Sequence, residues 1–87
     1  MSPKHEARIP LAFIPAGSEV WLSAIGDEID AHQREQLTAY GLAPNRPLKI
    51  LQQRPMTVIL AEEVELALEH MVARHIWVER NENENRS

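Results

Sequence analysis

Short runs of strand-forming residues alternate with turn residues along most of the chain. In the run at 20–25, the alternation of side chains along a strand turns Trp21 away from its two apolar neighbours. The run at 76–78 is β-branched and aromatic, and there the same alternation turns Trp77 away from the residues on either side. The inward positions of these two predicted strands are Val20, Leu22, Ile76 and Val78.

The middle of the chain predicts a hairpin. The run at 48–52 has Leu48 and Ile50 on one face, Arg54-Pro55 interrupts it, and residues 57–60 resume in strand-favouring types. The chain therefore reverses direction between the two runs.

Residues 61–75 fit two different structures. Read with helical spacing, apolar side chains recur every three or four residues over this stretch. Read with a period of two, Val64, Leu66 and Leu68 alternate with Glu65 and Ala67, as in a half-buried strand. The pattern alone leaves both structures open.

One α-helix is predicted at about residues 31–40. Asp30 is an N-cap whose carboxylate can accept from the backbone N–H of Gln33. Gly41 follows the helix at the position where a left-handed residue ends it, and Pro44 prevents its continuation. The combination of strands and one capped helix predicts a small β-barrel with the helix laid over it.

Length and composition exclude several classes of protein. The chain has 87 residues, a length that predicts one domain, at about residues 9–80. The polar segments at 1–8 and 81–87 are predicted to be disordered tails. The chain has no cysteine and a net charge of −4. No Lys/Arg block is present, so nucleic acid is not an expected partner. No apolar run is long enough to cross a bilayer, so we expect a cytoplasmic protein without direct membrane insertion.

The order of these signals resembles the FeoA family, the small SH3-like barrel proteins associated with bacterial ferrous iron uptake, and the related C-terminal domain of iron-dependent repressors. The resemblance runs from about Leu11 to Val78. It rests on the entry at 11–17, the strand ending at Ile25, the segment Leu-Thr-Ala-Tyr-Gly-Leu-Ala-Pro at 37–44, the strand at 48–50 and the closing pattern of Leu66, Leu68, Ala73, Ile76 and Val78.

The resemblance implies a mainly β, SH3-like barrel of about five strands. It also favours a strand at 64–68 and a short helical turn at about 69–74. The chain departs from the family pattern at two turns, where Asn45 and Glu62-Glu63 stand in place of glycine. Asparagine suits the second central position of a type II turn, because it tolerates positive φ.

The sequence contains few candidates for chemistry. His32 and Glu28 lie close together beside two aspartates, which makes them the candidate ligands for a transition metal ion. A structural role is nevertheless favoured, because Asp30 is explained as a cap and acidic residues before a helix are favoured by its dipole. No serine has a triad context and the three glycines are isolated. The sequence therefore predicts no enzyme, no catalytic residue and no bound cofactor.

Two outward tryptophans suggest a surface for a protein partner. Large aromatic side chains outside a core are common in interfaces, although a tryptophan can equally cover one end of a barrel. Met71 lies five residues before the closing strand, and we predict it as a neighbour of the same surface or as part of the core. Trp21, Trp77 and Met71 are thus the candidate partner-binding residues.

What the resemblance implies for function is a non-catalytic accessory protein that binds the cytosolic domain of the FeoB ferrous iron transporter. The alternative is a metal-responsive regulatory domain, like the C-terminal barrel of iron-dependent repressors. The chain lacks the DNA-binding helices that such a repressor needs. A homodimer is a third possible assembly.

Overall fold

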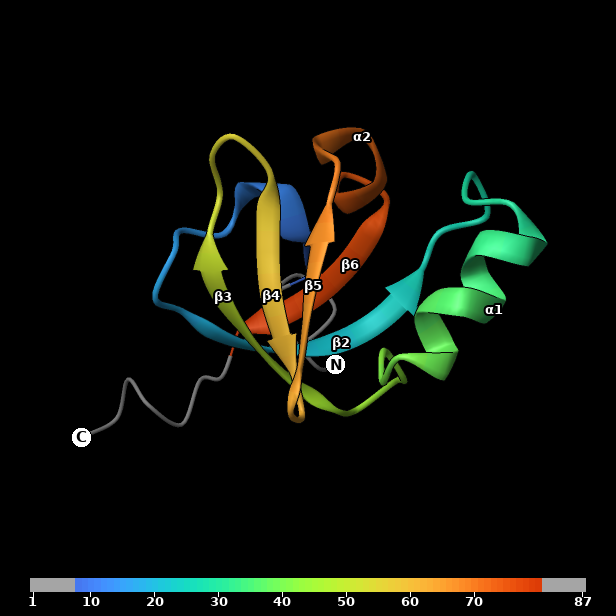
Figure 1. Ribbon diagram of the computed structural model, residues 1–87, viewed down its shortest axis with the longest axis horizontal. Coiled ribbons are helices and arrows are strands. Elements are labelled where there is room, and N and C mark those ends of the chain that lie inside the picture. The colour runs from blue at the N-terminus through green and yellow to red at the C-terminus, as the bar shows by residue number, and fades with distance from the viewer. Residues whose placement is uncertain (1–7, 81–87) are drawn as a thin grey trace, which may run out of the picture.

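The computed structural model describes residues 8–80. These residues form six strands and three helical segments (Figure 1). In chain order the elements are β1 (Arg8–Pro10), the 3₁₀ turn η2 (Leu11–Phe13), β2 (Glu19–Ile25), α1 (Ala31–Ala39), β3 (Pro47–Gln52), β4 (Thr57–Ala61), β5 (Val64–Leu68), α2 (His70–Ala73) and β6 (Ile76–Arg80).

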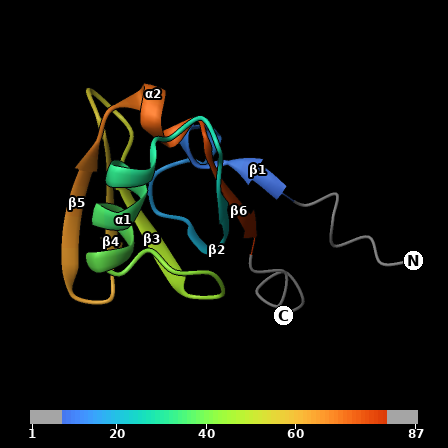
Figure 2. The same cartoon turned by 90° about the vertical axis from the view of Figure 1, so that its right-hand side faces the viewer.

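The six strands form one antiparallel sheet in the order β1-β6-β2-β3-β4-β5. Figure 2 shows the sheet bent so that β1 and β5 lie on opposite sides of the view, and Figure 1 shows α1 set to one side of it. The mainly β, SH3-like fold expected from the sequence is confirmed.

The ambiguous stretch at 61–75 is a strand followed by one short helix. β5 pairs with β4 in unbroken register from Thr57 opposite Leu68 to Ala61 opposite Val64. Leu66 faces the core and Leu68 is buried. The period of two prevails over helix propensity because β4 supplies a partner for the backbone and a core for alternate side chains.

Two expectations need correction at the N-terminal side. The structure has six strands where about five were expected, and Arg8, which was assigned to a disordered tail, belongs to β1. Three residues ending in proline carry too little pattern to predict a strand, and β1 exists because Ile9 pairs with Val78 of β6. The remainder of the predicted tails, 1–7 and 81–87, lies outside the described residues.

The predicted ends of α1 are found in the structure. The Asp30 carboxylate accepts from the backbone N–H of Gln33 at 2.8 Å. At the other end Gly41 has a φ of 114°, and the N–H of Leu42 donates to the carbonyl of Leu37 at 3.1 Å, as in a Schellman ending. Leu37 is the one residue of α1 that is buried, so this helix depends strongly on its caps.

Both turns that depart from the family pattern contain a residue with positive φ. Asn45 has a φ of 69° and Glu62 a φ of 60°. The turn at Asn45 is closed by a hydrogen bond from the N–H of Arg46 to the carbonyl of Ala43, at 3.1 Å. The side chain of Arg46 forms an ion pair with Glu62, which joins the two turns.

The core fills the space inside the bent sheet. Its buried aliphatic residues come from every strand but β1, and they include Leu11, Ile14, Val20, Leu22, Leu48, Ile50, Ile59, Leu68, Ile76 and Val78. Gln53 closes one end of this core: its side-chain amide donates to the carbonyls of Leu11 and Ile14, at 3.0 and 2.6 Å. The β3–β4 connection is thereby fixed to η2.

Candidate protein-interaction surface

Trp21 and Trp77 lie on the outer face of two neighbouring strands. Trp21 of β2 is opposite Glu79 of β6, and Trp77 precedes Glu79 by two positions on the same strand. Residues two apart on a strand share a face, so the two tryptophans are diagonal neighbours at a separation of roughly 7 to 8 Å. Two segments far apart in the sequence thus contribute to one aromatic surface.

Two prolines border this pair. Pro47 of β3 is opposite Trp21, and Pro10 of β1 is opposite Trp77. Cross-strand partners share a face, so each tryptophan has a proline beside it on the outer side. We call Trp21, Trp77, Pro10 and Pro47 the outer aromatic surface.

The orientation of both tryptophans is as predicted, but their exposure differs. Val20 and Leu22 are buried on the inner face, whereas Trp21 on the outer face is 37% exposed. Trp77 is less exposed than Trp21 and is partly buried. Trp21 therefore offers more ring surface to a partner than Trp77 does.

Met71 lies on a different element. Its side chain is 71% exposed on α2, which packs beside η2, and Phe13 of η2 is 66% exposed. These two apolar side chains stand on adjoining segments at the end of the sheet where α2 connects β5 to β6 (Figure 1). A role of Met71 in binding stays a prediction.

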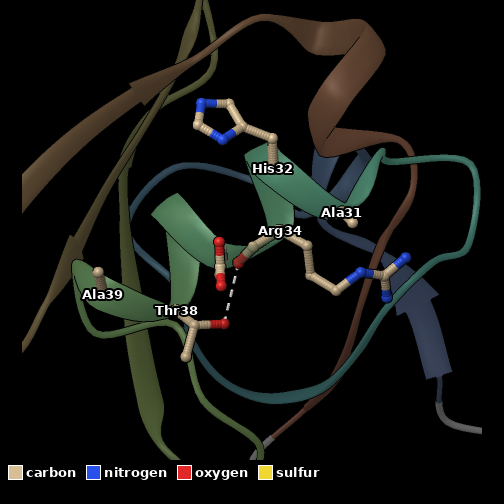
Figure 3. A pocket seen from close by; sticks show the side chains of 6 residues that line it. Ala31, His32, Arg34, Thr38 and Ala39 are labelled. Atoms are coloured by element: carbon tan, nitrogen blue, oxygen red, sulfur yellow. Dashed lines mark hydrogen bonds between the residues drawn. The ribbon is translucent and has the colours of Figure 1, made fainter.

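The candidate metal ligands have other roles or none in the described part of the chain. The carboxylate of Glu28 lies 3.5 Å from Nδ1 of His75. His32 is exposed on α1, where Figure 3 shows its ring pointing away from the side chain of Arg34. Within residues 8–80, no three acidic or histidine side chains lie together as a metal site requires.

Arg34 has a role that the sequence did not reveal. Its guanidinium donates to the carbonyls of Ile25, Gly26 and Ile29, at 3.1, 3.2 and 3.0 Å, and Asp27 lies 3.8 Å away. The same residue borders a cleft of about 260 Å³ between α1 and the end of β2. Because its N–H groups are used by backbone carbonyls, Arg34 holds the loop rather than serving a ligand.

Comparison with protein families decides what this barrel is. The FeoA domain model matches residues 9–80. The chain belongs to the FeoA family. Comparison with curated protein sequences gives no match.

Solved FeoA structures share the fold of this chain. A crystal structure of an iron uptake regulatory protein, FeoA, is 20% identical with a TM-score of 0.73, covering 85% of this chain and 97% of that one. The solution structure of FeoA from Chlorobium tepidum is 20% identical with a TM-score of 0.76, covering 83% of this chain and 70% of that one. At this identity the likeness concerns the fold alone.

The barrel also resembles part of a longer protein. The structure of IdeR from T. acidophilum is 20% identical with a TM-score of 0.73, and the match covers 86% of this chain and 35% of that one. This FeoA chain therefore corresponds to about a third of that protein's length.

Among residues 8–80 no helix has the length and apolar character to span a membrane.

Proposed function

We propose that this FeoA protein is a non-catalytic cytoplasmic accessory protein of ferrous iron uptake, which binds the cytosolic domain of a FeoB-type transporter. The observation that carries the proposal is the adjacency of Trp21 and Trp77 on the outside of the sheet. Membership in the FeoA family connects this chain with ferrous iron transport. The barrel in this role supplies a surface rather than a reaction.

The outer aromatic surface has the composition expected at the centre of a protein interface. Tryptophan is enriched among the residues that contribute most to binding, and its large rigid ring loses little conformational entropy. Proline is rigid as well, so four side chains from four strands present a preformed shape. A partner that covers Trp21 would bury apolar area that the monomer leaves in water.

The charges beside this surface are balanced. Glu79 lies between Trp21 and Arg8 across the sheet, and Glu19, two positions before Trp21 on β2, is opposite Lys49. The apolar rings, rather than a net charge, are therefore the part of this surface that we propose the partner covers.

The test measures, by calorimetry, the affinity of the purified protein for the cytosolic domain of the FeoB-type transporter from the same organism. Trp21→Ala should weaken the affinity by about tenfold or more, because truncation of a central tryptophan commonly has this effect. Trp77→Ala should weaken it less, since less of that ring is exposed. Met71→Ala reports whether the contact extends to α2.

Tyr40→Ala is the matched control. Tyr40 is an aromatic residue that is 52% exposed at the C-terminal end of α1 and does not belong to the outer aromatic surface. Its removal should change the affinity less than about twofold. Thermal unfolding of each variant establishes that the fold is intact, and equal binding by Trp21→Ala and the unmodified protein would refute the proposed surface.

A further inference from the structure

α1 is a helix with almost no buried surface. It has nine residues, of which Leu37 alone is buried, and its sequence, Ala-His-Gln-Arg-Glu-Gln-Leu-Thr-Ala, has no apolar stripe. The elements in extensive contact are neighbouring strands, and η2 with β6 and α2, whereas α1 packs broadly against none of them. A helix this short is marginal in water without packing. Its stability must therefore come from a few attachment points.

These attachment points are close to α1 in the sequence. The guanidinium of Arg34 reaches residues 25–29, and the Asp30 carboxylate caps the helix itself. Within the described residues, no hydrogen bond or ion pair of a side chain on α1 reaches a strand other than β2. The helix can therefore separate from the sheet without breaking the pairing of any two strands.

The chain is fixed to the sheet on both sides of α1. Before the helix, the N–H of Gly26 donates to the carbonyl of His75, at 2.7 Å. After it, the N–H of Asn45 donates to the carbonyl of Leu22, at 2.9 Å. Residues 27–41 lie between these two fixed points, and we call them the strap. Figure 1 shows this part of the chain set to one side of the sheet.

The strap contributes little to the core of the barrel. Ile29 and Leu37 are its two buried residues, and the other buried residues of the described chain lie outside it. Where α1 passes the end of β2, a cleft of about 260 Å³ lies between them, bordered by Thr38 on one side and Ser23 on the other. The sheet therefore keeps nearly all of its buried apolar contacts without the strap.

We propose that the strap opens and closes as a unit while the six-stranded sheet stays folded. Opening exposes Ile29 and Leu37 and breaks the hydrogen bonds of Arg34, but it leaves every strand pair intact. It also uncovers one edge of β2. The pairing of β3 with β2 ends at Trp21, and beyond it the carbonyl of Ile25 accepts from Arg34 of the strap. The strap is thus a cover for this edge, and its opening is a partial unfolding of the native protein.

Native-state hydrogen exchange in low concentrations of urea measures this opening. We expect the amides of residues 35–40 to exchange about a hundredfold faster or more, relative to their intrinsic rates, than the amides of β4 and β6. Opening of the strap exposes only a small part of the surface that global unfolding exposes. Exchange at residues 35–40 should therefore depend weakly on urea, and exchange in the strands steeply.

A substitution in the sheet separates the strap from the rest of the protein. The contacts of Gln53 with η2 are present in both the closed and the open form, so Gln53→Ala does not change the ratio of these forms. It should speed exchange in β4 and β6 by about tenfold or more and leave residues 35–40 unchanged. Thr57→Val is a milder variant of the same kind, for which we expect about fivefold faster exchange in the strands and again no change at residues 35–40.

Asp30→Ala is the complementary variant. It weakens only the closed form of the strap, from which both the opening and global unfolding start, so exchange should rise about fivefold at residues 35–40 and in the strands alike.

Three results would overturn the opening of the strap. They are exchange at residues 35–40 as slow as in the strands, acceleration of both by the same factor in Gln53→Ala, and no response of residues 35–40 to Asp30→Ala. The measurements use the FeoA protein alone, so they do not depend on the proposed transporter partner.

Discussion

The hydroxyl of Thr57 donates a hydrogen bond to the side-chain carbonyl of Gln53, at 2.6 Å. Thr57 is wholly buried and is the one buried polar residue in the described part of the chain. The amide nitrogen of Gln53 in turn donates to the carbonyl of Leu11 in η2 and to that of Ile14, the residue that follows η2. A single glutamine thus satisfies three buried or half-buried groups at one end of the barrel.

Removing either side of this pair should destabilise the protein by different amounts. Gln53→Ala leaves the Thr57 hydroxyl and the carbonyl of Ile14 without a partner, while the carbonyl of Leu11 still accepts from the N–H of Ile14. We expect a loss of about 2 to 3 kcal/mol in the free energy of unfolding. Thr57→Val keeps the volume and should lose about 1 kcal/mol. Urea unfolding of both variants and of the double variant measures these values, and equal losses in the two single variants would contradict the hierarchy.

Gly26 and Gly41 are required for different reasons. A Cβ at Gly26 would lie 2.8 Å from the carbonyl oxygen of His75, which already accepts from the Gly26 N–H. A Cβ at Gly41 would have ordinary contacts, but φ there is 114°. Alanine at either position should therefore destabilise the fold by about 1 to 3 kcal/mol.

Asparagine separates the two causes. Gly41→Asn should be milder than Gly41→Ala because asparagine tolerates positive φ, whereas Gly26→Asn should be at least as harmful as Gly26→Ala because the space is missing. Thermal unfolding of the four variants provides the measurement. If Gly26→Asn were more stable than Gly26→Ala, steric crowding would not be the cause of the destabilisation at position 26.

The positive φ of Glu62 predicts a stabilising substitution. A residue with a Cβ is strained by about 1 kcal/mol in this region, and glycine is not. The ion pair with Arg46 joins two side chains that are about half exposed, so its loss removes little stability. Glu62→Gly should raise the free energy of unfolding by about 0.5 kcal/mol.

Arg46→Ala isolates the ion pair in this comparison. Measured alone it should change stability by less than about 1 kcal/mol. Glu62→Gly introduced into the Arg46→Ala background then reports the backbone effect without the ion pair. A lower melting temperature of that double variant, relative to Arg46→Ala alone, would contradict backbone strain at the turn.

Local sequence signals were sufficient to predict the helix ends and the turn that depend on single side chains. Asp30 and Gly41 mark the ends of α1, and Asn45 marks a turn, because capping and positive φ depend on single side chains. The alternation in the runs at 20–25 and 76–78 likewise predicted which face of each strand is inside.

Features that depend on long-range pairing were not visible. Gln53 acquires its role from carbonyls 39 and 42 residues away, and Arg34 from a loop whose path is set by the sheet. The prolines beside the tryptophans are recognised only once the strand order is known, since Pro10 and Trp77 are far apart in sequence. The family resemblance supplied the strand assignment at 64–68, where the pattern left two possibilities.

The contribution of Arg34 should depend on its planar guanidinium. Lysine carries the same charge, but it cannot reach three separate carbonyls with a forked set of donors. Arg34→Lys should lower the free energy of unfolding by about 1 to 2 kcal/mol and increase hydrogen exchange in α1. The neighbouring Glu35→Gln, at an exposed position of the same helix, should leave both quantities unchanged.

Metal titration distinguishes an accessory protein from a metal-responsive regulatory domain. Glu28 is directed to His75 and not to a cluster of ligands, and residues 8–80 contain no group of three such side chains. We therefore expect His32→Ala and Glu28→Gln to leave the response to Mn²⁺ or Fe²⁺, measured anaerobically by calorimetry, the same as in the unmodified protein. Saturable one-to-one binding that either substitution abolishes would instead favour the regulatory domain, because it would require these two side chains to come together around the ion.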